Sequence, residues 1–195
     1  MPSDPRARDV AVMTDLSRVA ESLRRITVEV RDDAGSIGAG VLWPAGHVVT
    51  NAHVARRPRL TLGLVDGRHL EGRLLARDEA TDLALLRITG AGIGAATPLH
   101  STVVRIGSLV IAVGHPFGVR GAVTVGIVHA LGPVVRGGRT WIQADLRLGP
   151  GNSGGPIADG AGRVVGVSTM VMSTLGLAVP IADVQRFVRG MGILV

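Results

Sequence analysis

The sequence predicts an all-β protein of two packed, six-stranded antiparallel β-barrels, with a short N-terminal helix and a C-terminal helix. Three observations favour this fold class. The 28 glycines and 10 prolines, set among many Val, Ile and Leu residues, are typical of short strands joined by tight turns. Strand patterns follow one another without helices between them, which argues against a parallel α/β sheet. A glycine-rich connector at 89–101 divides these patterns into two groups of about six strands, which suggests two barrels.

The N-terminal part of the chain is predicted to be a leader, a helix and the first barrel. We expect a loose leader at 1–14 and a short amphipathic helix at 15–25, because Leu16, Val19 and Leu23 recur at helical spacing. The strands of the first barrel are expected at 26–31, 37–43, 47–51, 59–65, 68–77 and 82–88.

The C-terminal part is predicted to form the second barrel and a closing helix. Its strands are expected at 108–114, 122–131, 139–144, 155–158, 163–169 and 176–179. Apolar residues of 181–190 share one helical face, so this segment is expected to be the closing helix. We therefore divide the chain into a leader and helix (1–25), an N-terminal barrel (26–95) and a C-terminal barrel with its helix (96–195), which form one unit.

Composition indicates the kind of core and excludes several kinds of bonded or metal site. The 195 residues are 46% hydrophobic but hold only four aromatic side chains, so the core must be aliphatic. The absence of cysteine excludes disulfides and thiolate zinc sites. No cluster of His and Asp has the spacing of metal ligands, so we expect neither a metal nor another cofactor.

The charge and hydropathy of the sequence limit the kinds of partner that we expect. The net charge of +6 comes from arginines alone, which are scattered and have no stacking aromatics beside them, so we expect no nucleic acid to bind. No stretch reaches the roughly 18 apolar residues of a membrane span, and no signal peptide is visible. We expect a cytoplasmic protein if Met1 is the true start, and a periplasmic or extracellular one if an export signal was removed.

The segment Gly151-Asn152-Ser153-Gly154-Gly155-Pro156 is the most informative part of the chain. It places one serine among glycines, which allow the tight turn that aims backbone N–H groups at a developing oxyanion. A serine hydroxyl is a weak nucleophile unless a neighbouring base takes its proton. The segment therefore predicts a histidine and a carboxylate as companions.

Chain order restricts which companions are available. All six histidines precede Ser153, which excludes the α/β-hydrolase order of serine before histidine. An order of Asp, His, Ser would need Asp32 or Asp33, which lie in an Asp-Asp-Ala-Gly turn and are therefore disfavoured. The order His, Asp, Ser remains.

The favoured pair in this order is His53 and Asp82. His53 follows an apolar strand and a short polar turn, a position from which an imidazole can enter a cleft, and Asp82 opens an apolar strand. Three other aspartates lie between His53 and Ser153 in the sequence, and each suits a turn or a loop. They are Asp66, Asp78 and Asp145. The other histidines are interpreted as ordinary surface, core or turn residues, namely His47, His69, His100, His115 and His129.

At this point the sequence resembles the trypsin-like serine proteases, and within them the HtrA/Deg family. The matching blocks occur in the family's order and span about residues 36–181. They are Gly38–Trp43, Val49–Val54, Asp82–Ile88, Val113–Gly118, Ile142–Asp145, Gly151–Pro156 and Leu177–Pro180. Thr-Asn-Ala-His-Val together with Gly-Asn-Ser-Gly-Gly-Pro is a specific pair of motifs.

The resemblance implies two packed barrels of the chymotrypsin type and a serine endopeptidase that cleaves unfolded or misfolded proteins. It implies His53 as general base, Asp82 as its orienter and Ser153 as nucleophile. It also implies an oxyanion hole from the N–H groups of Gly151 and Ser153, with Asn152 between them. The pocket for the P1 residue, which precedes the cleaved bond, is then lined by Leu148, Ala178 and Val179, an aliphatic wall that favours Val, Ala or Leu at P1.

Two departures from the family pattern keep an alternative open. The family often carries C-terminal PDZ domains, whereas this sequence ends at Val195, so we expect no regulation by an attached PDZ domain. The run Leu146–Pro150 replaces the usual Ala-Ala-Ile-Asn-Pro type of run, and its Arg147 is expected to affect how the loop settles. The alternative is a latent or weak module on the same fold that binds proteins as a chaperone does.

The expected partners are polypeptide substrates. Family members often form trimers through their N-terminal segments, so residues 15–25 are expected either to build such a homo-oligomer or to pack against the barrel.

Overall fold

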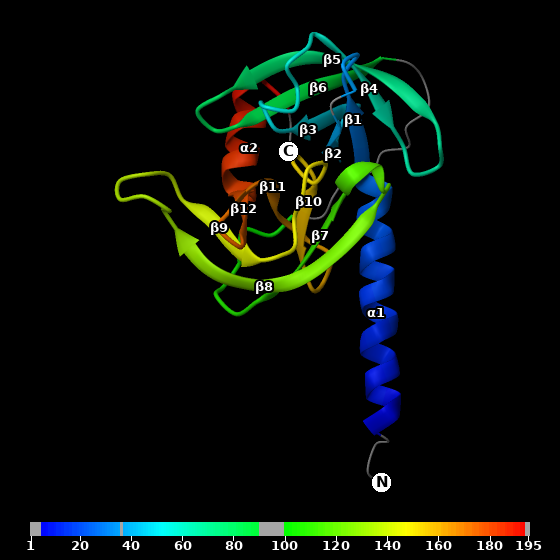
Figure 1. The fold of residues 1–195 in the computed structure, drawn as a ribbon, viewed down its shortest axis with the longest axis vertical. Coiled ribbons are helices and arrows are strands. Elements are labelled where there is room, and N and C mark those ends of the chain that lie inside the picture. The colour runs from blue at the N-terminus through cyan, green and yellow to red at the C-terminus, as the bar shows by residue number, and fades with distance from the viewer. Residues whose placement is uncertain (1–4, 36, 90–99, 194–195) are drawn as a thin grey trace.

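The computed structural model describes residues 5–35, 37–89 and 100–193, and it contains two closed six-stranded antiparallel barrels (Figure 1). The first has the strand order β1-β2-β3-β6-β5-β4 and the second the order β10-β11-β12-β9-β8-β7. The first barrel consists of β1 (Thr27–Arg31), β2 (Ile37–Trp43), β3 (His47–Thr50), β4 (Arg59–Gly63), β5 (His69–Asp78) and β6 (Leu83–Thr89). The second consists of β7 (Leu109–Gly114), β8 (Ala122–Gly132), β9 (Trp141–Asp145), β10 (Pro156–Asp159), β11 (Val164–Met172) and β12 (Leu175–Pro180).

The predicted fold class is confirmed, and each predicted strand is present with ends that differ by a few residues. The closing helix α2 (Ile181–Gly190) has its predicted bounds. A 3-10 turn, η1 (Pro116–Gly118), joins β7 to β8. Residues 90–99 of the predicted connector lie outside the described residues.

The N-terminal helix is longer than the sequence indicated. Helix α1 (Pro5–Ile26) includes residues 5–14, so a loose leader there was the wrong expectation, and residues 1–4 lie outside the described part. Proline is tolerated in the first turn of a helix, where its missing N–H would have no partner anyway, and no Pro or Gly interrupts the run after Pro5. In Figure 1 the early turns of α1 extend away from the barrels.

The interface between the barrels is an aliphatic core. One buried cluster combines Val49 and Leu85 of the first barrel with Ile111 and Val167 of the second. Helix α1 adds Leu23 to this cluster, and α2 adds Ile181, Val184 and Val188. Each barrel also has its own apolar interior. Because this packing fixes one barrel against the other, polar side chains at the ends of strands from both barrels are held in constant relative positions.

Two histidines whose Nε2 atoms are shielded from solvent, the buried His115 and the half-buried His100, lead to a prediction about stability and pH. Burial lowers the pKa of His100 and of His115 below the ordinary value of 6.5, and for His115 this outweighs the opposing effect of Glu29. In the unfolded chain both imidazoles take up protons as the pH falls through about 6.5, whereas in the fold they stay neutral to lower pH. The unfolded state then binds more protons, so the free energy of unfolding is expected to be smaller at pH 5 than at pH 7.

Urea unfolding at the two pH values measures this difference. His115→Gln should reduce it, while His129→Gln, at an exposed position, should leave it unchanged. A protein that is equally stable or more stable at pH 5 would contradict the prediction.

Candidate active site

His53 lies in a tight turn directly after β3. The carbonyl of Asn51 accepts hydrogen bonds from the N–H groups of Val54 (3.1 Å) and Ala55 (3.0 Å), which closes the turn. The Asn51 side-chain amide donates to the main-chain carbonyl of Asp82 (2.9 Å), so this turn and the start of β6 are tied together. The Arg77 guanidinium donates to the Ala52 carbonyl (2.8 Å), one residue before the histidine. The backbone that carries His53 is therefore held from two neighbouring strands.

Asp82 lies at the end of the turn between β5 and β6. Its φ of 52° is in the left-handed region, which a residue with a side chain rarely adopts. The Asp78 carboxylate organises the turn by accepting hydrogen bonds from the Ala80 N–H (2.9 Å) and the Thr81 hydroxyl (2.6 Å). This geometry directs the Asp82 carboxylate toward His53 rather than into solvent, and its side chain is only 15% exposed.

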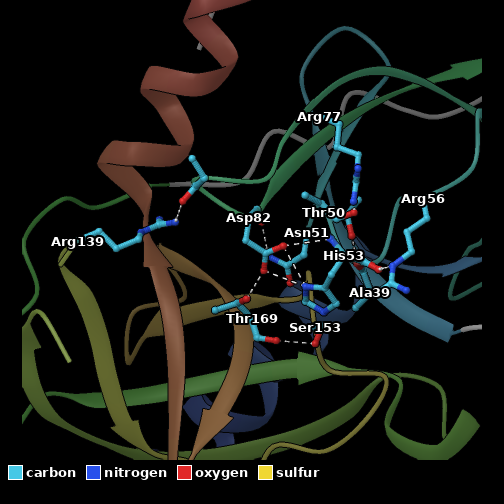
Figure 2. A network of polar contacts seen from close by, with 12 residues as sticks. Ala39, Thr50, Asn51, His53, Arg56, Arg77, Asp82, Arg139, Ser153 and Thr169 are labelled. Carbon is cyan, nitrogen blue, oxygen red and sulfur yellow. Dashed lines mark hydrogen bonds and ion pairs between the residues drawn. The ribbon is translucent and has the colours of Figure 1, made fainter. Parts of the chain in front are cut away.

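The carboxylate of Asp82 contacts His53 at two points (Figure 2). The Nδ1 atom of His53 lies 2.9 Å from Oδ2 and 3.0 Å from Oδ1, and the backbone N–H of His53 donates to Oδ1 at 3.1 Å. Thr169 of β11 also donates its hydroxyl to Oδ2. Burial raises the pKa of Asp82, but the hydrogen bonds from His53 and Thr169 outweigh burial and hold the pKa below its usual value. An ionised Asp82 can only accept, so Nδ1 carries the proton and Nε2 is left as an acceptor.

Ser153 lies with His53 on the wall of one cavity of about 440 Å³. Its Oγ donates to the Thr169 carbonyl at 2.6 Å (Figure 2). The structure therefore brings His53 and Ser153 to one cleft, with Asp82 hydrogen-bonded to the imidazole and Thr169 in contact with both Asp82 and Ser153. In this arrangement the serine proton is directed to Thr169 and not to the imidazole.

The loop before Ser153 is shaped by backbone hydrogen bonds to the segment at η1. The Phe117 N–H donates to the Pro150 carbonyl (3.0 Å), and the His115 N–H donates to the Gly151 carbonyl (2.9 Å). Gly151 has a φ of +103°, and a Cβ at this position would lie 2.2 Å from the His115 carbonyl oxygen, so only glycine fits.

Two N–H groups of this loop stay free. Within the described part of the chain, the N–H groups of Gly151 and Ser153 donate to no acceptor. The C=O and N–H of a trans peptide point in opposite directions, so a Pro150 carbonyl held by Phe117 turns the Gly151 N–H away from η1. The side chain of Asn152 is used within the loop, where it donates to the Gly149 carbonyl (3.2 Å).

The structure divides the predicted P1-pocket residues. Leu148 lines the cavity beside His53 and Ser153, as expected. Ala178 and Val179 are not among the residues that line it, because they lie on β12, the neighbour of β11 in the sheet, and are fully buried in the apolar cores. The opposite wall comes instead from β11, through Ser168, Thr169, Met170 and Val171.

Several polar residues around the cleft were not indicated by the sequence. Thr169 lies in the predicted strand segment Val-Ser-Thr-Met, and Arg77 looks like an ordinary charged residue at the end of a strand. Their roles depend on contacts between segments far apart in the chain, so no local pattern distinguishes them. Arg147, which was expected to affect the loop, is exposed.

Among the described residues no group of three or more His, Cys, Asp or Glu side chains could hold a metal ion. In the same part of the chain, neither helix has the length and apolar character to cross a membrane.

The chain is similar to known proteins in sequence and in fold. Residues 38–167 match the family model described as a trypsin-like peptidase domain. A probable periplasmic serine endoprotease, DegP-like, of Brucella suis biovar 1 (strain 1330) is 40% identical over 158 residues, which cover 74% of this chain and 29% of that protein. The putative serine protease HhoB of Synechocystis sp. is 36% identical over 162 residues, which cover 76% of this chain and 38% of that protein.

A solved structure is also similar. The HtrA-type protease AlgW, determined with a tripeptide, has a TM-score of 0.83 and 28% sequence identity, and the match covers 90% of this chain and 63% of that one. The match to the curated relatives spans only 29% to 38% of their length.

Proposed function

The chain belongs to the trypsin-like peptidase family, as a protease domain of the HtrA/Deg type, and from this premise we propose that it is a serine endopeptidase. Its substrates are proposed to be unfolded or misfolded polypeptides. The observation that carries the proposal is the His53–Asp82 pair, in which a carboxylate holds Nδ1 at 2.9 Å while Ser153 lies on the same cavity wall as the imidazole.

The proposed reaction begins when the Ser153 hydroxyl rotates from the Thr169 carbonyl toward Nε2 of His53. His53 takes the hydroxyl proton as Oγ attacks the substrate carbonyl, and Asp82 stabilises the imidazolium that forms. The imidazolium then gives its proton to the amine as the C–N bond breaks. Water, deprotonated by the same imidazole, hydrolyses the acyl-enzyme and restores Ser153.

The negative charge on the tetrahedral intermediate is proposed to lie against the N–H groups of Gly151 and Ser153, with Asn152 between them. Two features support a hole that is formed before substrate arrives. Both N–H groups lack an acceptor within the described residues, and the Phe117–Pro150 hydrogen bond keeps the Pro150 carbonyl out of the hole. Preorganised donors of this kind stabilise the transition state without reorganisation during the reaction.

We propose an aliphatic P1 preference, carried by Leu148 together with Met170 and Val171. Among the described residues that line the cavity, His53 is the only one with an ionisable side chain. Peptides with Val, Ala or Leu at P1 are therefore expected to have a kcat/KM about 100-fold or more above those with Lys or Asp, because a charge would be buried without a partner. Among the aliphatic residues discrimination should be softer, at about 1–3 kcal/mol per methylene. A peptide series varied only at P1 measures this, and a preference for a charged residue would contradict it.

The test of the proposed function is active-site labelling of the wild-type protein. An organofluorophosphonate should react with one equivalent of protein, mass spectrometry should place the adduct on Ser153, and casein cleavage should stop in proportion to labelling. Cleavage that continues after full labelling, or an adduct elsewhere, would overturn the assignment.

A second candidate function is favoured by one observation. The Ser153 hydroxyl donates its hydrogen bond to the Thr169 carbonyl and not to the imidazole. This arrangement suits a latent site on a protein-binding module. Such a module would bind an unfolded substrate but neither cleave it nor react with the fluorophosphonate, so the same labelling experiment decides between the two.

A further inference from the structure

Arg139 connects the two barrels next to the candidate site (Figure 2). It belongs to the connection between β8 and β9 of the second barrel, and its guanidinium lies 4.2 Å from the centre of the Trp141 ring. Its Nη1 donates to the Ala80 carbonyl at 3.2 Å. Ala80 is part of the turn that leads into Asp82 in the first barrel, so one side chain fixes this turn from the other barrel.

The charges around the guanidinium are three carboxylates from two parts of the fold. Asp78 and Asp82 belong to the turn that Arg139 contacts, and Asp183 belongs to the first turn of α2. Burial lowers the pKa of Arg139, whereas these three carboxylates act in the opposite direction. The Nη2 atom is shielded from solvent and has no hydrogen-bond partner among the described residues. Burying part of a cation while one of its donors has no partner costs free energy. We therefore expect Arg139 to have a structural role in addition to its charge.

The turn that Arg139 contacts has a strained end. Asp82 is held at a φ of 52°, and a non-glycine residue keeps such a conformation only where its surroundings enforce it. The Asp78 carboxylate accepts hydrogen bonds from within the turn, and the Asn51 amide donates to the Asp82 carbonyl from the turn after β3. Arg139 supplies the contact from the second barrel, where Ser153 and Thr169 also lie.

We propose that Arg139 is a positioning residue that keeps the Asp82 carboxylate aimed at His53 by fixing the Ala80 carbonyl and the turn around it. The proposal rests on the proposed hydrolytic function. Arg139 does not line the cavity, so it acts on turnover rather than on substrate binding. A misplacement of a catalytic group by about 1 Å can lower a rate by about 100-fold.

The first part of the test compares single variants. Arg139→Gln is expected to lower kcat by about 10- to 100-fold with KM unchanged. Arg139→Lys should lie between this variant and wild type, because lysine keeps the charge but loses the planar group that stacks on Trp141 and donates in a fixed direction. The control is Arg136→Gln, an exposed arginine of the same β8–β9 connection, which should retain wild-type kcat.

The second part is a double-mutant cycle with Asp82→Asn. If Arg139 acts through Asp82, Arg139→Gln should change the residual kcat, or the fluorophosphonate labelling rate, less than about threefold in that background. An equal loss in both backgrounds would show a general effect on folding and would overturn the proposal, as would unchanged kcat in the single variants.

Folding is followed by thermal unfolding of each variant. If Arg139→Gln does not fold, the same cycle with Arg139→Lys gives the answer. A wild-type protein that neither cleaves nor labels would instead refute the proposed function and leave nothing for Arg139 to position.

Discussion

Replacing Ser153 with alanine is expected to lower kcat for peptide hydrolysis by about a million-fold, the loss seen when the nucleophile of a serine protease triad is removed. The variant lacks the hydroxyl oxygen that attacks the substrate carbonyl in the proposed mechanism. The residual rate would come from substrate binding and from the N–H groups of Gly151 and Ser153, which the substitution leaves in place. Steady-state cleavage of casein or of a P1-valine peptide measures the change.

The fold should survive this substitution. In the structure the Ser153 hydroxyl makes one hydrogen bond, to the Thr169 carbonyl, and the net contribution of such a bond to stability is about 1 kcal/mol. The thermal unfolding midpoint should therefore change little, while covalent labelling disappears. A Ser153→Ala protein that still labels and cleaves like wild type would refute the role proposed for this residue.

Replacing Asp82 with asparagine is expected to lower kcat by about ten-thousand-fold. The asparagine amide can donate a hydrogen bond to Nδ1 of His53, which favours the tautomer that carries its proton on Nε2. In that tautomer Nε2 cannot take the proton of Ser153. Asparagine nearly preserves the shape of the aspartate side chain. The loss of kcat therefore reports the protonation of the His53 imidazole and not a change in packing.

The control for this variant is Asp145→Asn. Asp145 is an exposed aspartate at the end of β9, close to Ser153 in the sequence, and its substitution should leave kcat within about twofold, as is usual for surface changes away from the reacting groups. Equal activity of Asp82→Asn and wild type would show that another group orients His53. A large loss in Asp145→Asn would point to that residue instead.

Local patterns were sufficient to locate the strands and the closing helix α2. Period-two alternation predicted the first strand, and bounding Gly, Pro and Asp residues marked the strands that follow, some of which, such as β3, are buried along their whole length. The helix α1 was the exception. Its residues 5–14 lack a clear amphipathic pattern, and helix-forming composition alone did not distinguish them from a leader.

The candidate site was only partly visible in the sequence. Ser153 stands out because its glycine neighbours satisfy a turn that few other sequences allow, and His53 follows a strand into a polar turn. Leu148 lines the cavity, whereas Ala178 and Val179, also expected at the pocket, are buried in the apolar cores on β12. Strand alternation tells which residues share a face of a sheet, but not which strand forms the wall of a cleft.

The sequence by itself determined the fold class, the order of the strands along the chain and the segment that carries the candidate nucleophile, because these depend on periodicity, turn chemistry and short motifs. Tertiary structure alone decided that Thr169 contacts both Asp82 and Ser153, and that Arg139 reaches the turn before Asp82. These contacts join residues 59 to 87 positions apart across the barrel interface, or 16 positions apart between a loop and β11. Their existence depends on how two closed sheets pack, which no single segment of the chain encodes.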